Sequence, residues 1–414
     1  MDMADTRTDP HVGPFRSDAS TPHLVGAAWA LLLINTLAYS NVVTIVPLSR
    51  QTAQIITMGS LLVALGLALA LNPRIRVQPS PYLLLMSLLL VVSVASSLRL
   101  ESGSGSLFRC FRLAVFLATL WLLSRWWRGN LTFVRYHIRC LAAVLLTVLI
   151  GLATSPGTAL SEQSHGRLTG TLWPIPPPQV AQYAAVVIGL TIVLWLTRSI
   201  DGRSAAWIVA PAICIFLLSH TRTATIGLVA ALVGAGVTLI LSNARARRAL
   251  VVTVVFGGVV AATLGPAVQA WWTRGQDAEM LGSLTGRRAV WDRLLAQDRS
   301  LMQQMLGMGL TNKGYNGLPI DSSWLSIYND QGFVGVAIVA VILVGLLVAA
   351  ALRPPSPARA CAVFLILYCA IVSYTEAGLG DASPYLLHLA VAASLLSQAA
   401  PTAAVPAVMA RTPG

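Results

Sequence analysis

Arginine and acidic side chains stand where apolar stretches of this sequence begin or end. Arg222 lies in Ser-His-Thr-Arg-Thr between two apolar stretches, and Arg167 and Arg287 lie in polar connections. Asp321 ends the second connection, and Glu376 follows a later apolar stretch. Guanidinium groups bind phosphate through paired hydrogen bonds, and a carboxylate can take a proton from an attacking hydroxyl. These residue types suit glycosyl transfer from a polyprenyl-diphosphate carrier, whose leaving group the arginines would stabilise.

Each of these residues also has a simpler interpretation. Arg222 could extend to the lipid headgroups, as arginines near the ends of membrane helices do. Asp321 could cap a helix that begins at Ser322, and Glu376 could pair with an arginine to join two helices. Arg288, next to Arg287, could be a solvated neighbour or a supporting residue. The sequence leaves these alternatives open.

The sequence lacks the common motifs of other reaction classes. It has no His-Glu-x-x-His, no P-loop and no Gly-x-Ser-x-Gly. The first predicted outer connection, 46–51, has no acid, which disfavours metal-dependent transfer from lipid-linked sugars. The five cysteines form no Cys-x-x-Cys pair and suit small buried residues. We therefore predict no cofactor and no metal.

The composition indicates that lipid surrounds the elements that position these residues. Hydrophobic residues make up 56% of the 414 and charged residues only 10%, against about 25% charged in soluble domains. The net charge of +13 comes from arginines between apolar stretches, which favours anchoring at the inner leaflet over nucleic-acid binding. We expect membrane lipids as partners and no nucleic acid.

Apolar stretches of about 20 residues predict an all-α, polytopic membrane protein with about 12 transmembrane helices. The stretches place the spans near 24–45, 53–72, 81–98, 107–124, 140–154, 179–197, 205–220, 223–242, 249–268, 324–352, 359–376 and 383–399. The stretch 324–352 is too long for one span, so we expect its first turns to project from the bilayer.

The arginines predict the orientation and the domain limits. Most of the arginines, among them Arg125, Arg128 and Arg353, lie in connections that we expect on the inner side of the membrane. This orientation puts both termini in the cytoplasm, and we expect the membrane to be the inner (plasma) membrane of the cell. The transmembrane domain then covers 24–399, between tails 1–23 and 400–414. Its outer connections are 155–178 and the long loop 270–323, which has predicted short helices at 287–296 and 298–305.

Four stretches together resemble the O-antigen ligase and O-antigen polymerase superfamily. They are Gly166-Arg167-Leu-Thr-Gly-Thr with Gln179-Val-Ala-Gln-Tyr, Ser219-His-Thr-Arg222-Thr-Ala, Thr285-Gly-Arg287-Arg-Ala-Val-Trp291 with Leu306-Gly-Met-Gly-Leu310, and Asp321-Ser-Ser-Trp-Leu325 with Gln331-Gly-Phe-Val-Gly335. The resemblance runs from about Gly166 to Glu376. It implies metal-independent, inverting glycosyl transfer in the outer leaflet, from a glycan on undecaprenyl diphosphate to a glycan or lipid acceptor.

The resemblance also implies roles for single residues. Arg222 and Arg287 match diphosphate-binding positions, and Asp321 stands at the position of the catalytic base. Many ligases of the family have His-Asn where this chain has Asp321 and Ser322. The difference favours a polymerase or an exopolysaccharide-type member over a ligase. From its residue type and place, Arg167 is also predicted to bind the diphosphate, and Arg288, Trp291 and Glu376 are predicted to support the site. A transporter or flippase, or an accessory scaffold for lipid-linked glycans, is the alternative function.

Overall fold

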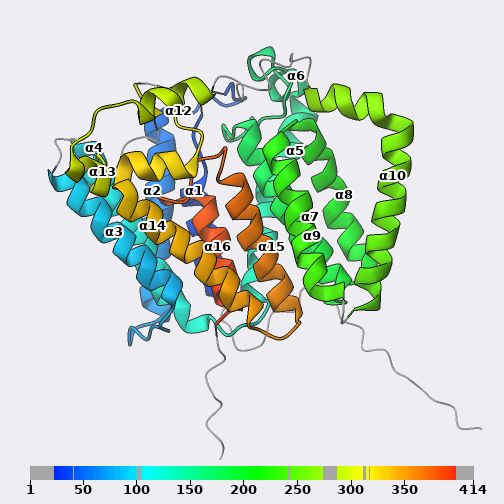
Figure 1. Cartoon of the computed structure of the whole chain (residues 1–414), viewed down its shortest axis with the longest axis horizontal. Coiled ribbons are helices and arrows are strands. Elements are labelled where there is room, and N and C mark those ends of the chain that lie inside the picture. Colours follow the sequence, from blue (N-terminus) through cyan, green and yellow to red (C-terminus); the bar gives the residue numbers. More distant parts are fainter. Residues whose placement is uncertain are drawn as a thin grey trace, which may run out of the picture.

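The computed structural model describes residues 23–40, 42–99, 104–240, 243–273, 287–310, 314–316 and 318–397. Most residues in these ranges are helical and very few are in strands (Figure 1), which confirms the predicted all-α class. The predicted tails 1–23 (except His23) and 400–414, and residues 274–286 of the long outer loop, lie outside the described residues.

A helix lies at or near every predicted span. The helices are α1 (His23–Thr36), α2 (Arg50–Leu71), α3 (Pro81–Arg99), α4 (Ser104–Leu123), α5 (Thr132–Thr154), α6 (Pro156–Ala159), α7 (Pro177–Leu196), α8 (Gly202–Leu218), α9 (Arg222–Ile240), α10 (Ala244–Thr273), α12 (Arg287–Leu295), α13 (Leu301–Leu306), α14 (Ser323–Ala351), α15 (Pro357–Val372) and α16 (Pro384–Leu395). The short helices α12 and α13 agree with the two predicted in the long loop. A small hairpin of β1 (Gly314–Tyr315) and β2 (Leu318–Pro319) follows them.

The described helices confirm only part of the predicted number of membrane spans. Seven described helices are long and apolar enough to cross a membrane: α2, α3, α4, α5, α7, α9 and α14. The helices α1, α8, α15 and α16 are apolar but have only 14, 17, 16 and 12 residues. The helix α10 is kinked at Leu264 and carries Pro266. A membrane protein is thus indicated, and the count of 12 is not shown.

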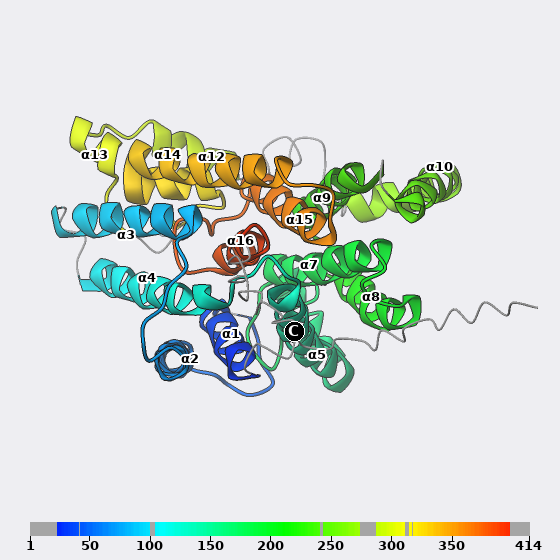
Figure 2. The same ribbon diagram turned by 90° about the horizontal axis from the view of Figure 1, so that it is seen from below.

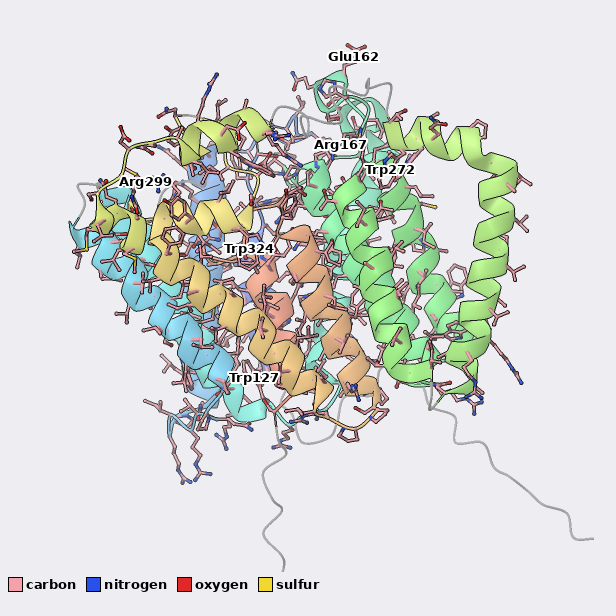
Figure 3. All side chains as sticks on the ribbon, viewed as in Figure 1. Trp127, Glu162, Arg167, Trp272, Arg299 and Trp324 are labelled. Atoms are coloured by element: carbon pink, nitrogen blue, oxygen red, sulfur yellow. The ribbon has the colours of Figure 1, made fainter. Side chains whose placement is uncertain are left out.

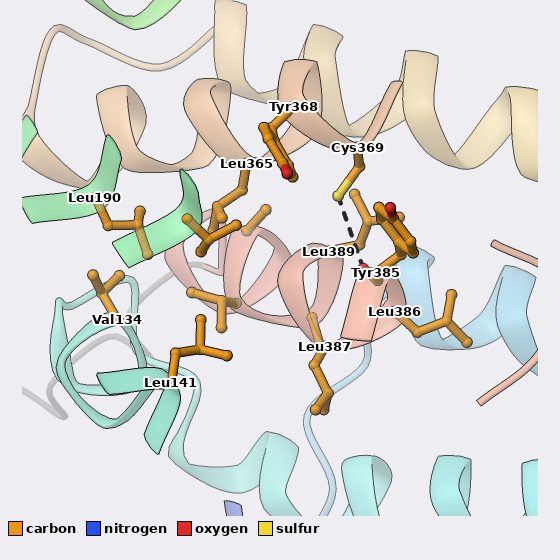
Figure 4. Close-up of a cluster of buried hydrophobic side chains, with 14 of the residues drawn as sticks. Val134, Leu141, Leu190, Leu365, Tyr368, Cys369, Tyr385, Leu386, Leu387 and Leu389 are labelled. Carbon is orange, nitrogen blue, oxygen red and sulfur yellow. Dashed lines mark hydrogen bonds between the residues drawn. The ribbon is translucent and has the colours of Figure 1, made fainter. Parts of the chain in front are cut away.

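Two helices at the centre of the bundle are shielded by the others (Figure 2). All twelve residues of α16 are buried, and so is nearly all of α7. Side chains of α5, α7, α15 and α16 meet in the apolar core around Leu365, Tyr368 and Tyr385 (Figure 4). A helix that is apolar on every face needs such a central place.

A buried chain of polar side chains ties four helices together within this core. Trp29 Nε1 donates to His137 Nδ1 at 3.3 Å, and His137 Nε2 lies 2.7 Å from His388 Nδ1. The Gln182 amide lies 3.0 Å from His388 Nε2. Because the indole can only donate, the proton of His137 lies on Nε2 and that of His388 on Nε2, so Gln182 must present its oxygen. The network thereby joins α1, α5, α16 and α7.

The long helix α14 is broken at Gly332, which has a positive φ of 66°. The break leaves carbonyl groups of the preceding turn without hydrogen-bond donors in the helix, and N–H groups of the loop after α13 donate to them instead. Met308 N–H donates to Asn329 O at 2.8 Å, and Gly309 N–H donates to Asp330 O at 3.0 Å. A Cβ on Gly307 would lie 2.3 Å from the backbone of Asp330. The short first segment of α14, predicted to project from the bilayer, is thus a separate helix held by α13 (Figure 1).

The helix α1 ends nine residues before the predicted limit of its span, and the chain then packs on another connection. Ser40 N–H donates to Pro174 O at 3.2 Å, and Ile45 N–H donates to Thr171 O at 3.0 Å. Trp173 Nε1 donates to Ala38 O at 3.0 Å. These bonds fix the connection between α6 and α7, which carries Arg167.

Candidate functional site

The predicted site residues converge on one cavity of about 770 Å³ at the end of the bundle that carries α6 and α12. Figure 3 labels Arg167 and Trp272 at this end and Trp127 at the opposite end. Five of the seven predicted residues line the cavity. Among the described residues, the lining consists of Arg167, Pro178, Thr221, Arg222, Thr223, Ile226, Trp272, Arg287, Asp321, Ile371, Tyr374, Thr375 and Glu376.

Arg287, the first residue of α12, lies between two carboxyl groups. Its Nε donates to Asp321 Oδ2 at 3.0 Å, and its Nη2 lies 3.7 Å from Glu376 Oε1. The Arg287 side chain is 26% exposed, so the guanidinium faces the cavity from a partly buried place. The buried residues Val290 and Leu294 anchor α12 to the bundle and so hold Arg287 in place.

Arg167 is fixed on the turn between α8 and α9. Its Nε donates to Ser219 O at 3.1 Å, and its Nη2 donates to Thr221 Oγ1 at 2.9 Å. Burial lowers the pKa of Arg167, while Glu376 opposes that shift, and Arg287 and Arg222 add to it. A guanidinium stays protonated under such a shift, so Arg167 remains a fixed positive charge.

Arg222 is the first residue of α9, and its Nη2 donates to Thr273 O at the end of α10 at 3.2 Å. The cavity is lined by Thr221, Arg222 and Thr223, that is, by the first turn of α9. The N-terminus of a helix carries a partial positive charge and free N–H groups, which favour a bound anion. The Arg222 guanidinium and the N-terminus of α9 therefore both favour a bound anion in the cavity.

Asp321 precedes α14 and does not cap it. The N-cap residue is Ser322, and the Asp321 side chain is bonded to Arg287 instead. Ser323 N–H donates to Ser373 O at 2.9 Å, and Ser323 Oγ donates to Glu376 O at 2.7 Å. These two bonds hold the turn after α15 against the start of α14 and so bring Glu376 next to Asp321.

Glu376 is the more buried of the two carboxyl groups: its side chain is 19% exposed, and that of Asp321 is 36% exposed. Burial raises the pKa of Glu376 to about 7, even though Arg287 opposes the shift; Asp321 raises it and Arg167 lowers it. The predicted alternative, pairing of Glu376 with an arginine, also describes this geometry. Glu376 thus takes up or releases a proton close to neutral pH.

Two predicted supporting residues lie outside the cavity lining. Arg288 is exposed and does not line the cavity, so the structure does not bring it into the site. Trp291 reaches the site through another ring: it packs edge-on against Tyr374 with centroids 5.6 Å apart, and Tyr374 lines the cavity.

Other lining residues were not predicted from the sequence. Thr223 and Thr375 join α9 to the turn after α15 through a 2.7 Å hydrogen bond. Trp272 comes from the end of α10 and adds an apolar wall. Threonines and tryptophans are frequent at helix ends for many reasons, so their types alone carry no signal here. Among the described residues, no three His, Cys, Asp or Glu side chains are grouped to hold a metal ion.

Comparison with known proteins does not assign the chain to a family. No protein-family model matches the chain, and no curated protein matches it significantly.

Proposed function

We propose that this protein is a glycosyltransferase that moves or polymerises a glycan from undecaprenyl diphosphate onto an acceptor hydroxyl. The observation that carries the proposal is the meeting of three arginines with two carboxyl groups in one cavity at a helix-bundle end. These five residues come from four separate connections of a strongly apolar chain. The resemblance to the O-antigen ligase and polymerase superfamily supports the same reaction.

The arginines suit the diphosphate of the donor. Arg222 acts together with the first turn of α9, and Arg167 is held beside it by Thr221. Three guanidinium groups outnumber the two carboxyl groups, so the cavity favours an anion. As the bond from the sugar to the diphosphate breaks, negative charge develops on the diphosphate oxygen, and fixed positive groups stabilise it.

Asp321 suits the base. The acceptor hydroxyl attacks the anomeric carbon on the face opposite the diphosphate, and its proton passes to the Asp321 carboxylate. The new glycosidic bond forms as the bond to the diphosphate breaks, so the configuration inverts. Arg287 orients Asp321 through its Nε, and Glu376 holds the other side of the same guanidinium. The charge stabilisation comes from arginines, and no cofactor is proposed.

The proposal includes a topology with 12 spans: the seven long helices together with α1, α8, α10, α15 and α16. The cavity end then faces the outer side of an inner membrane, and both termini are cytoplasmic. Arginines on connections near the opposite end support this orientation. Arg125 donates to Asn72 Oδ1 at 3.4 Å, and Arg359 donates to Arg353 O at 2.7 Å.

The alternative of a transporter or a scaffold has less support. A transporter needs a polar path through the middle of the bundle. The middle instead holds an apolar core, in which the polar chain from Trp29 to Gln182 is buried and its members bond to one another. A scaffold would not need the paired contacts of Arg287. The charged residues of the cavity gather at one end, as expected for chemistry at the membrane surface.

Gene deletion and complementation test the proposal. We expect the deletion to accumulate undecaprenyl-linked glycan, and we expect Arg222→Ala, Arg287→Ala and Asp321→Ala to reach the membrane without restoring surface glycan. The matched control is Arg293→Ala, an exposed arginine on α12 outside the cavity lining, which should restore it fully. Full rescue by the three cavity variants would refute the proposed reaction. Glycan chain length would separate a polymerase from a ligase.

A further inference from the structure

A buried amide at the break in α14 lacks a donor for its oxygen. Gln331 Nε2 donates to Ser93 Oγ on α3 at 2.9 Å and to Gly380 O, after α15, at 2.8 Å. The Ser93 hydroxyl gives its own proton to Leu89 O at 2.8 Å, and a carbonyl can only accept, so both contacts require the amide nitrogen. The orientation of Gln331 is therefore fixed, and no group among the described residues donates to its Oε1.

The oxygen of Gln331 faces a small cavity. The residue is 0% exposed, and a buried acceptor without a partner is destabilising because it has lost its hydrogen bonds to water. Proteins satisfy such groups with an ordered water molecule or an ion. The cavity has a volume of about 10 Å³, which is close to the smallest that holds one particle of the size of water. Its chemistry decides which particle fits.

The groups around the cavity are rich in oxygen, and two of them are acids. They come from the first segment of α14 and from the turn after α15: Ser323, Ser326, Ile327, Asp330, Gln331, Gly378, Gly380 and Asp381. Carboxylate, amide and hydroxyl oxygens are the ligands that small hard cations prefer. A carboxylate has about four acceptor positions, so the 2.6 Å hydrogen bond from Ala382 N–H to Asp381 Oδ1 does not prevent binding of a cation. The lining therefore favours a cation over a neutral water molecule.

The charge near the cavity favours a cation with a single charge. Asp330 and Asp381 both attract Arg109 of α4, which offsets part of their negative charge. Arg112, one turn further along α4, donates to Asn35 Oδ1 at 3.3 Å and is thus held by α1. Because Arg109 already offsets part of the negative charge, one positive charge suits the cavity better than two.

We propose that a small monovalent cation, of about the size of sodium, binds between Gln331 Oε1 and the carboxylates of Asp330 and Asp381. The proposal does not depend on the proposed transfer reaction. The cation joins the first segment of α14 to the turn after α15, which Ser323 also connects by donating to Glu376 O and accepting from Gly378 N–H. It thereby stiffens the support of the carboxyl groups in the candidate site and takes no part in the transfer step.

Thermal unfolding of the purified full-length protein in sodium chloride and in choline chloride, at equal ionic strength, tests the proposal. Choline is too large for the cavity and serves as the inert cation. Asp330→Asn and Asp381→Asn each remove one negative charge and keep the size of the side chain. Asp298→Asn is the matched control, because Asp298 is exposed, lies between α12 and α13 and does not line the cavity.

We expect sodium to raise the Tm of the wild type and of the control by about 2 °C or more, with saturation, and we expect both cavity variants to lose this gain. An equal wild-type Tm in the two salts would overturn the proposal, because a water molecule would then suffice for Gln331. An undiminished gain in either cavity variant would overturn it as well. If Asp330→Asn does not fold, Asp381→Asn decides, because Asp381 is only partly buried. A larger gain in calcium chloride at the same ionic strength would overturn the assignment of a monovalent cation.

Discussion

Replacement of Glu376 by glutamine should stabilise the protein above neutral pH. Burial raises the pKa of Glu376 from 4.5 to about 7, against the opposing charge of Arg287. The folded protein therefore holds this proton more tightly than the unfolded chain. The resulting stability is fully present below the unfolded pKa and is lost as the pH rises through the folded one. A glutamine stays neutral at every pH, so the Glu376→Gln variant does not lose this stability as the pH rises.

The size of the effect follows from the rise of the Glu376 pKa from 4.5 to about 7. Each unit corresponds to about 1.4 kcal/mol, so the ionised Glu376 lowers the free energy of unfolding by up to about 3 kcal/mol. Most of that loss is present near pH 8, and less than about 1 kcal/mol near pH 5. We therefore expect Glu376→Gln to raise Tm clearly near pH 8 and little near pH 5.

Thermal unfolding of the purified protein at both pH values measures the difference. Glu162→Gln is the control, because Glu162 is an exposed carboxyl at the same end of the bundle and outside the cavity lining. This control shows how much of the Tm change comes from removing one negative charge and how much comes from removing a buried carboxyl group. An equal Tm change for Glu376→Gln at both pH values would refute the reasoning. A lower Tm near pH 8 would show that Arg287 stabilises the ionised carboxylate by more than burial costs.

Three further predictions concern the donor, the break in α14 and metal ions. Undecaprenyl diphosphate should bind more weakly as the pH rises through about 7, because ionised Glu376 repels the diphosphate, and Glu376→Gln should remove that dependence; a flat wild-type curve would contradict it. Gly332→Ala should destabilise the protein by about 2 kcal/mol or more, because φ is +66° and a Cβ would lie 2.4 Å from the Met305 backbone. Gly345→Ala is its control, with no atom within 4 Å, and an equal fall in Tm would count against the argument. Glycosyl transfer by the purified protein should survive EDTA within about twofold, whereas abolition would show that a metal ion takes part.

Apolar runs predict where helices lie but not where they stop. The run 24–45 continues past Thr36, yet residues 37–40 leave α1 and bond to the connection that carries Arg167. At the other extreme, α5 begins at Thr132, eight residues before the predicted span, and includes Arg135 and Arg139. At the end of α1, bonds between distant segments accompany the boundary, and hydropathy does not record them. At the start of α5, polar and charged residues belong to the helix, so the apolar run begins later than the helix does.

The break in α14 has a local signal and a distant cause. The length of the stretch 324–352 predicted that its first turns leave the bilayer, but the place of the break depends on Gly332 and on the loop at Gly307. Each glycine lets the other backbone approach to a distance that a Cβ would prevent. Glycine pairs of this kind can be named from the sequence only after the partner segment is known.

In the candidate site too, residue types predicted some features and packing determined the others. The positions of Arg167, Arg222 and Arg287 at polar connections of an apolar chain were enough to predict that they lie together, and they line one cavity at one end of the bundle. The division of work between Asp321 and Glu376 was not predictable, because both carboxyl groups flank the same guanidinium and differ mainly in burial. That burial depends on the turn after α15, which Ser323 holds to the start of α14 through its hydroxyl and its N–H. Ser323, two residues after the predicted base, thus holds the turn that carries the second carboxyl, 53 residues away in the chain.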